Sequence, residues 1–555
     1  MSSDTRTVPL LKEPRGRGTA RGRRRALSHP AGEFLRAGAG ERIGALCLLV
    51  IVGVSVLVVL MAATRPSILS PTTHAHFFPR WMAGPLGGAW PGLTRNATAQ
   101  KYLFTGAIVL MYASYLVALR YVPRLRARWA IAGILAVHLV YLISPPLALT
   151  DIFNYIDYGR MEVVHHLNPY TTIPVLEPHS DPSYMLSNWH ELLSPYGPLF
   201  TLLTFAVVPL GVAASFWVLK AMLVAASLAT IFLVWKCARL LGRDPVAAIV
   251  LVGLNPIVLV WGLGGAHNDF LMLLFIMLGF YLLLSAASRR ELAPAAPAAA
   301  ASAPAAASAP AAAASAPPLA PGAPAPEKIR LGARLRGWLL PLCAAEIGAG
   351  AALVTAAAIK ASGAVLIPVM LGSLLKAPRR LIQVVIGMLA GGLLVAAVSL
   401  LAFGLHSPDL STQGRLVTSE SIPNLLGLAL GSGGETETLR FLLSGALAGS
   451  VLLCAVVAWR GRREGADRLL TASGWATVAL LVTLSWVLPW YVLWLLPLAA
   501  LSSSRRLRAA AVVLGVYLML AWAPAAGLLW NAIGFHPESS YLGHVHQRYV
   551  KELLN

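Results

Sequence analysis

Two carboxylates stand in a short polar segment that follows an apolar stretch, Asp151-Ile-Phe-Asn-Tyr-Ile-Asp-Tyr-Gly-Arg160. If the segment is helical, Asp151, Tyr155 and Tyr158 share one face, while Asp157 and Arg160 are close enough to pair. Partial burial raises the pKa of a carboxylate and suits it to act as a general base. Asp151 is therefore a candidate catalytic base, whereas Asp157, with Arg160 nearby, is interpreted as a structural residue. The alternative for Asp151 is a helix N-cap.

A second polar cluster, Gly264-Gly-Ala-His-Asn-Asp269, separates two apolar stretches. Its glycines permit a tight turn with close backbone approach, and His267, Asn268 and Asp269 offer donors and acceptors that suit sugar hydroxyls or a phosphate. Asp269 could equally cap the following helix. The three side chains could also bind a divalent cation, but without a partner at fixed spacing they do not define a metal site.

A lysine and a group of aromatic residues complete the candidate chemistry. Lys360 lies at the expected turn of a helical hairpin, where an ammonium needs an anion or a route to the membrane interface. It could reach lipid headgroups, or it could act with Arg415 to neutralise the phosphate of a lipid-linked donor. Trp490 and Tyr491 could stack on a sugar ring, although an interfacial aromatic belt also explains them.

The composition indicates that these residues belong to an integral membrane protein. Of 555 residues, 57% are hydrophobic and 12% are charged, whereas a soluble domain carries about a quarter charged residues. The net charge of +21 comes from short basic clusters beside apolar stretches, which are typical of topology signals and contacts with anionic lipid, and not of nucleic-acid binding. The four cysteines fall in predicted spans and indicate no disulfide or metal site.

Apolar stretches and basic clusters together predict an all-α bundle of about thirteen membrane spans, because Lys and Arg excess stays on the cytoplasmic side. A short re-entrant or interfacial helix is expected at 199–211. The expected crossings are 43–63, 102–120, 129–149, 215–240, 245–263, 270–288, two short helices meeting near Lys360, 382–403, 440–458, a hairpin over 467–503, and 509–528 followed by a short outer tail.

The same pattern divides the chain into four parts. Residues 1–42 form a basic, disordered cytoplasmic tail, and 43–290 form an N-terminal transmembrane half that carries the candidate catalytic residues. Residues 291–327 are almost entirely Ala, Pro and Ser, which indicates a solvated cytoplasmic linker. Residues 328–555 form the second transmembrane half. The polar clusters then lie on the extracytoplasmic face of the cell membrane.

The order of these motifs resembles a known family of enzymes. It is similar to that of the actinobacterial polyprenyl-phosphomannose-dependent mannosyltransferases that build the α(1→6) mannan backbone of lipomannan and lipoarabinomannan, in the glycosyltransferase C superfamily. The resemblance covers roughly residues 40–530. The motifs that carry it are Asp151 with Tyr155 and Gly159, Asn168-Pro-Tyr170, Tyr196-Gly-Pro198, and Gly264-Gly-Ala-His-Asn-Asp269.

The resemblance implies an inverting transfer of mannose from a polyprenyl-phosphate donor to a lipid-anchored mannan. Asp151 matches the Asp that deprotonates the acceptor hydroxyl, although it follows the third predicted span where the family has it after the first, which implies an added N-terminal helix pair. No nucleotide-binding loop is needed, because the phosphodiester already supplies a leaving group. The expected substrate-binding residues are Tyr155, Asp157, Tyr158, Arg160, Asn168, Tyr170, Tyr196, His267, Asn268, Asp269, Lys360, Arg415, Trp490 and Tyr491.

A polytopic transporter or lipid flippase for an envelope glycolipid is the alternative. Transporters tend to place charged groups at the middle of the bilayer and to contain inverted repeats. The polar clusters of this sequence instead fall on one expected face, and no convincing repeat is present. The enzyme is therefore the favoured hypothesis.

Overall fold

The protein is described by a computed structural model whose regular secondary structure is helical in the residues it describes. These are 38–64, 95–147, 150–292, 344–461 and 465–554, with Ser67, Leu69, Phe78, Pro79 and Gly92. No strand occurs among them. The predicted basic tail lies outside these residues up to residue 37, as do residues 293–327 of the predicted Ala/Pro linker.

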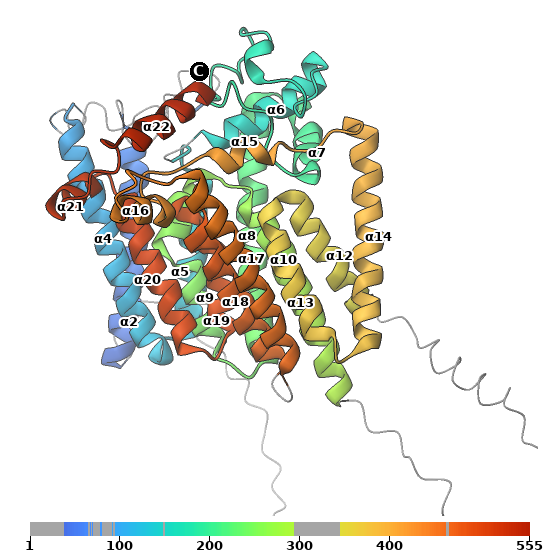
Figure 1. Ribbon diagram of the computed structural model, residues 1–555. Helices are drawn as coiled ribbons and strands as arrows, with labels where there is room; N and C mark the ends of the chain where they lie inside the picture. Colours follow the sequence, from blue (N-terminus) through green and yellow to red (C-terminus); the bar gives the residue numbers. More distant parts are fainter. Residues whose placement is uncertain are drawn as a thin grey trace, which may run out of the picture.

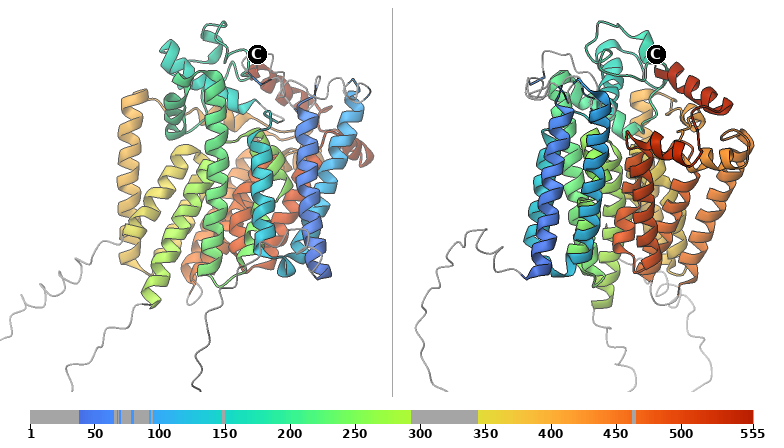
Figure 2. Two further views of the ribbon diagram at one scale, coloured as in Figure 1. Left: turned by 180° about the vertical axis from the view of Figure 1, so that it is seen from behind. Right: turned by 90° about the vertical axis from the view of Figure 1, so that its left-hand side faces the viewer.

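The first half of the chain supplies long helices and, between them, a polar helix that begins at Asp151. Figures 1 and 2 show the long helices side by side in one bundle. The helices are α2 (Ala39–Ala62), α4 (Ala97–Tyr121), α5 (Ala127–Leu142), α6 (Asp151–His165), α7 (Pro198–Val207), α8 (Val212–Leu240), α9 (Pro245–Gly253) and α10 (Asp269–Leu292).

The second half continues the bundle and ends in short helices that lie across one end of it. The helices are α12 (Ala344–Ile359), α13 (Ile367–Leu374), α14 (Pro378–Phe403), α15 (Leu410–Arg415), α16 (Ile422–Ala429), α17 (Glu437–Arg460), α18 (Gly465–Thr483), α19 (Leu496–Leu501), α20 (Arg505–Ala521), α21 (Ala526–Ala532) and α22 (Tyr541–Leu554). In Figure 1, α6, α15 and α22 lie at the top of the bundle.

Six helices of the described chain are long and apolar enough to cross a membrane, or seven if α20 and α21, which are bent by 98°, form one span. Shorter apolar helices of 10–17 residues occupy other predicted crossings. The predicted span 245–263 consists of α9 and a π-helical turn, Val258–Leu263. The total of about thirteen crossings stays a prediction.

The predicted short outer tail contains two helices that the sequence analysis did not identify. The last long helix, α20, ends at Ala521, and the chain after it forms α21 and α22. Helix α22 is amphipathic, and its Leu553 packs against Leu192 and Leu416. The apolar face of this helix needs a partner surface, which the end of the bundle supplies.

Small residues allow two helices of the second half to approach closely. A Cβ atom at Gly350 of α12 would lie 2.0 Å from the carbonyl oxygen of Val384, and one at Gly387 of α14 would lie 1.9 Å from that of Ile347. Small residues at such positions let helix backbones pack directly in lipid, where van der Waals contact drives association. These two glycines therefore set the spacing of α12 and α14.

The variant Gly387→Ala is expected to reduce the free energy of unfolding by about 1–3 kcal/mol, because the added methyl group meets backbone that cannot rotate away. Gly392→Ala on the same helix is the matched control, since nothing lies within 4 Å of its Cβ position. The loss can be measured by SDS titration of the purified protein in mixed micelles. Equal stability of the two variants would contradict the close-packing argument.

Candidate active site

A cavity of about 220 Å³ opens at the end of the bundle covered by α6 and α22. It brings together residues from the two polar clusters, the Lys360 turn and the aromatic turn before α19. The predicted site residues that line it are Asp151, Tyr155, Tyr158, Tyr196, His267, Lys360, Trp490 and Tyr491. Segments more than 300 residues apart in the sequence therefore meet around one space.

Asp151 is the first residue of α6, but its carboxylate does not cap the helix. Thr150 occupies the N-cap position, and the Asp151 oxygens instead lie 3.3 Å from the Tyr196 hydroxyl and 3.3 Å from His267 Nδ1. The N-cap interpretation is therefore wrong. Burial raises the pKa of Asp151 to about 6, even though the Lys360 ammonium opposes this effect.

His267 is held in a strained loop beside Asp151. The preceding Ala266 has φ of 54°, a left-handed conformation that costs an L-residue on the order of 1 kcal/mol. A Cβ atom at Gly265 would lie 2.4 Å from the His267 ring, so only glycine leaves room for the imidazole. The ring stacks on Trp490, with centroids 3.5 Å apart. Burial lowers the pKa of His267 well below its usual value, so the imidazole is neutral.

A buried ion pair joins Asp269 to Lys360. The Lys360 ammonium lies 2.8 and 3.0 Å from the two carboxylate oxygens, and the indole of Trp494 donates to one of them at 2.6 Å. The Asp269 carboxylate therefore binds a cation and an indole instead of capping α10. The ammonium also lies 4.9 Å from the centre of the Tyr491 ring. Lys360 thus faces the cavity with its position fixed by Asp269.

The His267-Asn268-Asp269 trio does not converge on one point. His267 faces Asp151 while Asp269 faces Lys360, and the Asn268 backbone N–H donates to the Tyr155 hydroxyl at 3.3 Å. In the described parts of the chain, no group of three or more His, Cys, Asp or Glu residues is arranged to hold a metal ion. The trio therefore serves three separate contacts and forms no shared set of metal ligands.

Asn168 and Tyr170 lie outside the cavity and position a residue that lines it. The Asn168 amide donates to the Phe403 carbonyl at the end of α14, at 3.0 Å. The Tyr170 hydroxyl donates to the Tyr196 carbonyl at 2.8 Å. The next residue, Gly197, donates its N–H to the Ile359 carbonyl at 3.1 Å, beside Lys360. These bonds place Tyr196 against Asp151.

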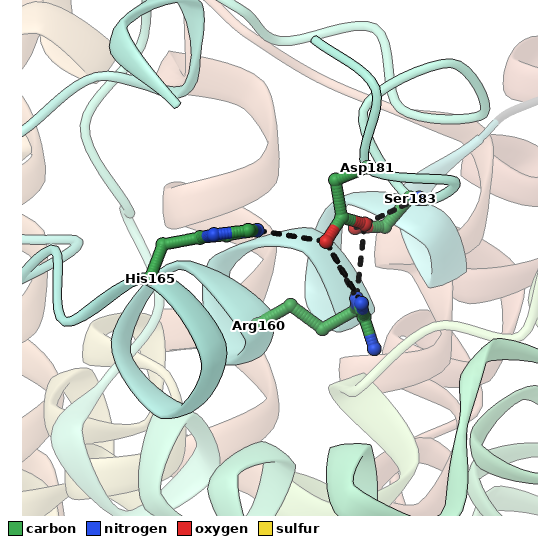
Figure 3. A network of polar contacts seen from close by, with 4 residues as sticks. All are labelled: Arg160, His165, Asp181 and Ser183. Carbon is green, nitrogen blue, oxygen red and sulfur yellow. Dashed lines mark hydrogen bonds and ion pairs between the residues drawn. The ribbon is translucent and has the colours of Figure 1, made fainter. Parts of the chain in front are cut away.

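The predicted pair of Asp157 and Arg160 is wrong. The Arg160 guanidinium binds both oxygens of Asp181 at 2.8–3.1 Å, and His165 and Ser183 bind the same carboxylate, as Figure 3 shows. The loop after α6 folds back and presents Asp181 to the planar guanidinium, whose geometry suits a bidentate contact with a carboxylate. Neither Asp157 nor Arg160 lines the cavity.

Asp157 is instead paired with a second carboxyl group. Asp157 and Glu177 are 1% and 4% exposed, and none of their four carboxyl oxygens accepts a hydrogen bond from the described residues. The two carboxyl groups act on each other's pKa, and neighbouring buried carboxyl groups favour a state in which one keeps a proton. Burial and the neighbouring Asp157 raise the pKa of Glu177 to about 10, and burial raises the pKa of Asp157. This pair shares a proton in the folded protein.

Arg415 does not face the cavity. It is exposed at the end of α15, and Gln413 of the same helix lines the cavity in its place. Sequence analysis also missed the contribution of Trp494 and of α22, whose Val550 and Leu554 line the cavity. The apolar periodicity of residues 541–554 is a signal that could have identified this helix, whereas nothing local pairs Trp494 with Asp269.

Comparisons with known proteins point to one family. Residues 50–320 match the family model described as alpha-(1->6)-mannopyranosyltransferase, N-terminal domain, and residues 418–535 match the model described as MptB C-terminal domain. Together the two models match more than half of the chain.

Two curated proteins share shorter stretches with the chain. An alpha-(1->6)-mannopyranosyltransferase A from Mycobacterium tuberculosis is 33% identical over 138 residues, 24% of this chain and 26% of that protein. A protein of the same name from Corynebacterium glutamicum is 26% identical over 150 residues, 26% of this chain and 30% of that protein. The matches thus span less than a third of these relatives' length. No solved structure matches the chain.

The proton shared by Asp157 and Glu177 predicts a pH-dependent stability. Because the folded pKa of Glu177 is raised, its contribution is complete at acid pH and is lost as pH rises toward about 10. The melting temperature should therefore fall between about pH 5 and about pH 9, and Glu177→Gln should flatten that fall because an amide does not titrate. Thermal unfolding in detergent at stepped pH measures this effect.

The control is Glu191→Gln, which changes an exposed carboxylate on the same loop. It should leave the slope of melting temperature against pH unchanged. If the Glu177→Gln and Glu191→Gln proteins both keep the wild-type slope, Asp157 and Glu177 do not share a proton in the folded state.

Proposed function

Because the chain belongs to the alpha-(1->6)-mannopyranosyltransferase family, we propose that it transfers mannose from a polyprenyl-phosphate donor to a mannan acceptor. The new bond is an α(1→6) linkage, formed with inversion at the anomeric carbon, and the acceptor is a lipid-anchored mannan. One observation carries this proposal. A partly buried carboxylate with a raised pKa, Asp151, faces the same cavity as a fixed cation, Lys360.

Asp151 acts as the general base. It removes the proton from the acceptor hydroxyl while the oxygen attacks the anomeric carbon from the face opposite the phosphate, and this geometry inverts the configuration. The bond from the anomeric carbon to the phosphate oxygen breaks, and polyprenyl phosphate leaves. Asp151 suits this step because, within the described part of the chain, its polar contacts are two of 3.3 Å, and the carboxylate can exchange these long contacts for the acceptor hydroxyl.

Lys360 stabilises the phosphate as it leaves. A fixed cation contributes most where charge develops in a site with little water, because it needs no reorganisation during the reaction. Asp269 and Trp494 hold this side chain in place. Trp490 and Tyr491 line the same cavity and offer aromatic surface to a sugar ring.

The basic residues support an extracytoplasmic site. Helix α4 is followed by a basic segment. Basic residues also stand at the end of α8 and at the start of α20. These helix ends lie at the end of the bundle opposite α22. The positive-inside rule assigns that end to the cytoplasm. The short apolar helices would then be crossings that complete a glycosyltransferase C bundle of about thirteen spans, with residues 43–290 as the catalytic half and 328–555 as the second half.

The direct test is transfer of labelled mannose from purified polyprenyl-phosphate mannose to a short α(1→6) mannoside by the purified protein in detergent. A glycosyltransferase makes a longer labelled mannoside. A flippase would move the donor across a vesicle membrane without making a glycosidic bond, so a product-free result with donor movement would overturn the proposal.

Asp151→Asn is expected to lower transfer by a factor of about 10² to 10⁴, the usual contribution of a general base. The substitution keeps the size of the side chain, so the protein should fold normally. Asp409→Asn is the control, because Asp409 caps the start of α15 and does not itself line the cavity, and Asn caps helices as well as Asp. Product formation by the Asp151→Asn protein at the wild-type rate would remove Asp151 from the role of base.

The pH dependence of kcat/KM tests the same residue by another route. A base must be ionised, so kcat/KM should fall as pH drops below about 6, the pKa of Asp151. The Tyr196 hydroxyl lowers that pKa by donating to the carboxylate, so Tyr196→Phe should move the acid limb to higher pH.

Tyr158→Phe is the matched control for this profile. Tyr158 also lines the cavity, but its hydroxyl donates to the Leu192 carbonyl at 2.6 Å. Its loss should leave the position of the acid limb unchanged. An acid limb that moves equally in both variants would show that it reports another group.

A further inference from the structure

A second hollow lies at the opposite end of the bundle from the candidate active site. This groove has a volume of about 890 Å³ and is bounded by α4, α9 and α20 and by the segment that joins α19 to α20. Helix α20 links the two places, because Arg505 at its start lines the groove and Trp522 just after its end lines the active-site cavity. A helix of 17 residues is about 25 Å long. The groove is therefore a separate site.

The floor of the groove carries more positive than negative charge. Three arginines, Arg243, Arg505 and Arg508, line the groove together with one carboxylate, Asp244. Among the residues that the structure describes, Arg505 and Arg508 have no carboxylate within ion-pair distance. Arg508 donates to the neutral carbonyl of Ser502 at 2.6 Å. Both guanidinium groups thus retain donors for an anion.

The two carboxylates near the groove are already occupied. Asp467 pairs with Arg243 and also accepts from the Ser503 backbone N–H at 2.7 Å. Asp244 accepts the N–H groups of Val246 and Ala247 as the N-cap of α9. The second terminal nitrogen of Arg243, Nη1, is buried without a hydrogen-bond partner in the described chain. The groove therefore presents unsatisfied positive charge.

The walls of the groove are apolar and reach the outer surface of the bundle. They consist of Leu119, Ala247, Ala248, Leu251, Ala509, Val512 and Val513. Val513 is 65% exposed, and a helix that crosses a membrane exposes such a side chain to lipid. A positively charged floor with apolar walls matches a molecule that has an anionic headgroup and a hydrocarbon chain. Basic pockets between membrane helices bind the headgroups of anionic lipids in this way.

We propose that this groove is a binding site for one anionic phospholipid of the membrane leaflet opposite the active site. The lipid phosphate lies between Arg505 and Arg508, whose planar groups can each donate two hydrogen bonds to phosphate oxygens. The first part of an acyl chain packs against Leu251 and Val513. The site does not depend on the proposed transfer reaction, because it shares no residue with the active-site cavity.

The test uses the full-length protein in neutral detergent, with phosphatidylglycerol added and bound lipid counted by native mass spectrometry. Phosphatidylglycerol should bind and raise the melting temperature. The variant Arg505→Gln/Arg508→Gln should bind it roughly thirtyfold more weakly. Each basic group near an anionic lipid strengthens binding by about five- to sixfold, and the loss of two groups multiplies these factors. Arg506→Gln is the control, because this exposed neighbour does not line the groove.

Two further arms identify what the groove recognises. Phosphatidylcholine should bind more weakly than phosphatidylglycerol, and inorganic phosphate alone should not stabilise the protein. Val513→Ser should weaken phosphatidylglycerol binding without affecting folding, which covers the case in which the double variant fails to fold. Equal binding of the two lipids, stabilisation by phosphate alone, or an equal loss in the Arg506→Gln protein would overturn the proposal.

Discussion

The buried ion pair between Lys360 and Asp269 is the interaction on which the arrangement of the candidate site depends. Asp269 is fully buried, and a buried carboxylate without a partner costs several kcal/mol. Its partners come from positions 91 and 225 residues later in the chain, Lys360 and Trp494. Any packing that separated these segments would leave a charge in an apolar interior. The pair therefore holds the start of α10, the end of α12 and the turn before α19 around one cavity.

This constraint also separates the roles of two nearby carboxylates, Asp151, which lines the cavity, and Asp269, which lies behind Lys360. Asp269 has a cation and an indole donor at 2.6–3.0 Å, so its oxygens are committed to structure. Among the described residues, Asp151 makes two longer contacts of 3.3 Å, and burial raises its pKa to about 6. The two aspartates thus differ in their readiness to take up a proton. Asp269 is held by strong partners, whereas Asp151 is largely shielded from water and has weak ones. Of these two carboxylates, Asp151 is the one without a cation at short range, as a proton acceptor requires.

The sequence predicts an all-helical protein because apolar runs and basic clusters are local signals. It places Asp151 and His267 on one expected face, and the fold brings the two side chains into contact. It fails where a partner is chosen across the fold. Arg160 binds Asp181, 21 residues away, in place of Asp157 on its own helix, because a loop presents a better geometry. Lys360 is recognised as a cation in need of an anion, but only the fold identifies Asp269. Helix α22 is missed because it is a short amphipathic segment that depends on the surface it covers.

The segment from Asn168 to Gly197 explains why residues outside the cavity belong to the same motifs as those inside it. Asn168 ties this segment to the end of α14, Tyr170 binds the Tyr196 carbonyl, and Gly197 binds the end of α12. Each bond limits where the Tyr196 hydroxyl can lie, and that hydroxyl contacts Asp151. An error of about 1 Å in the position of a reacting group can cost a hundredfold in rate. Asn168 and Tyr170 are thus accounted for by their part in positioning Tyr196, although neither side chain lines the cavity.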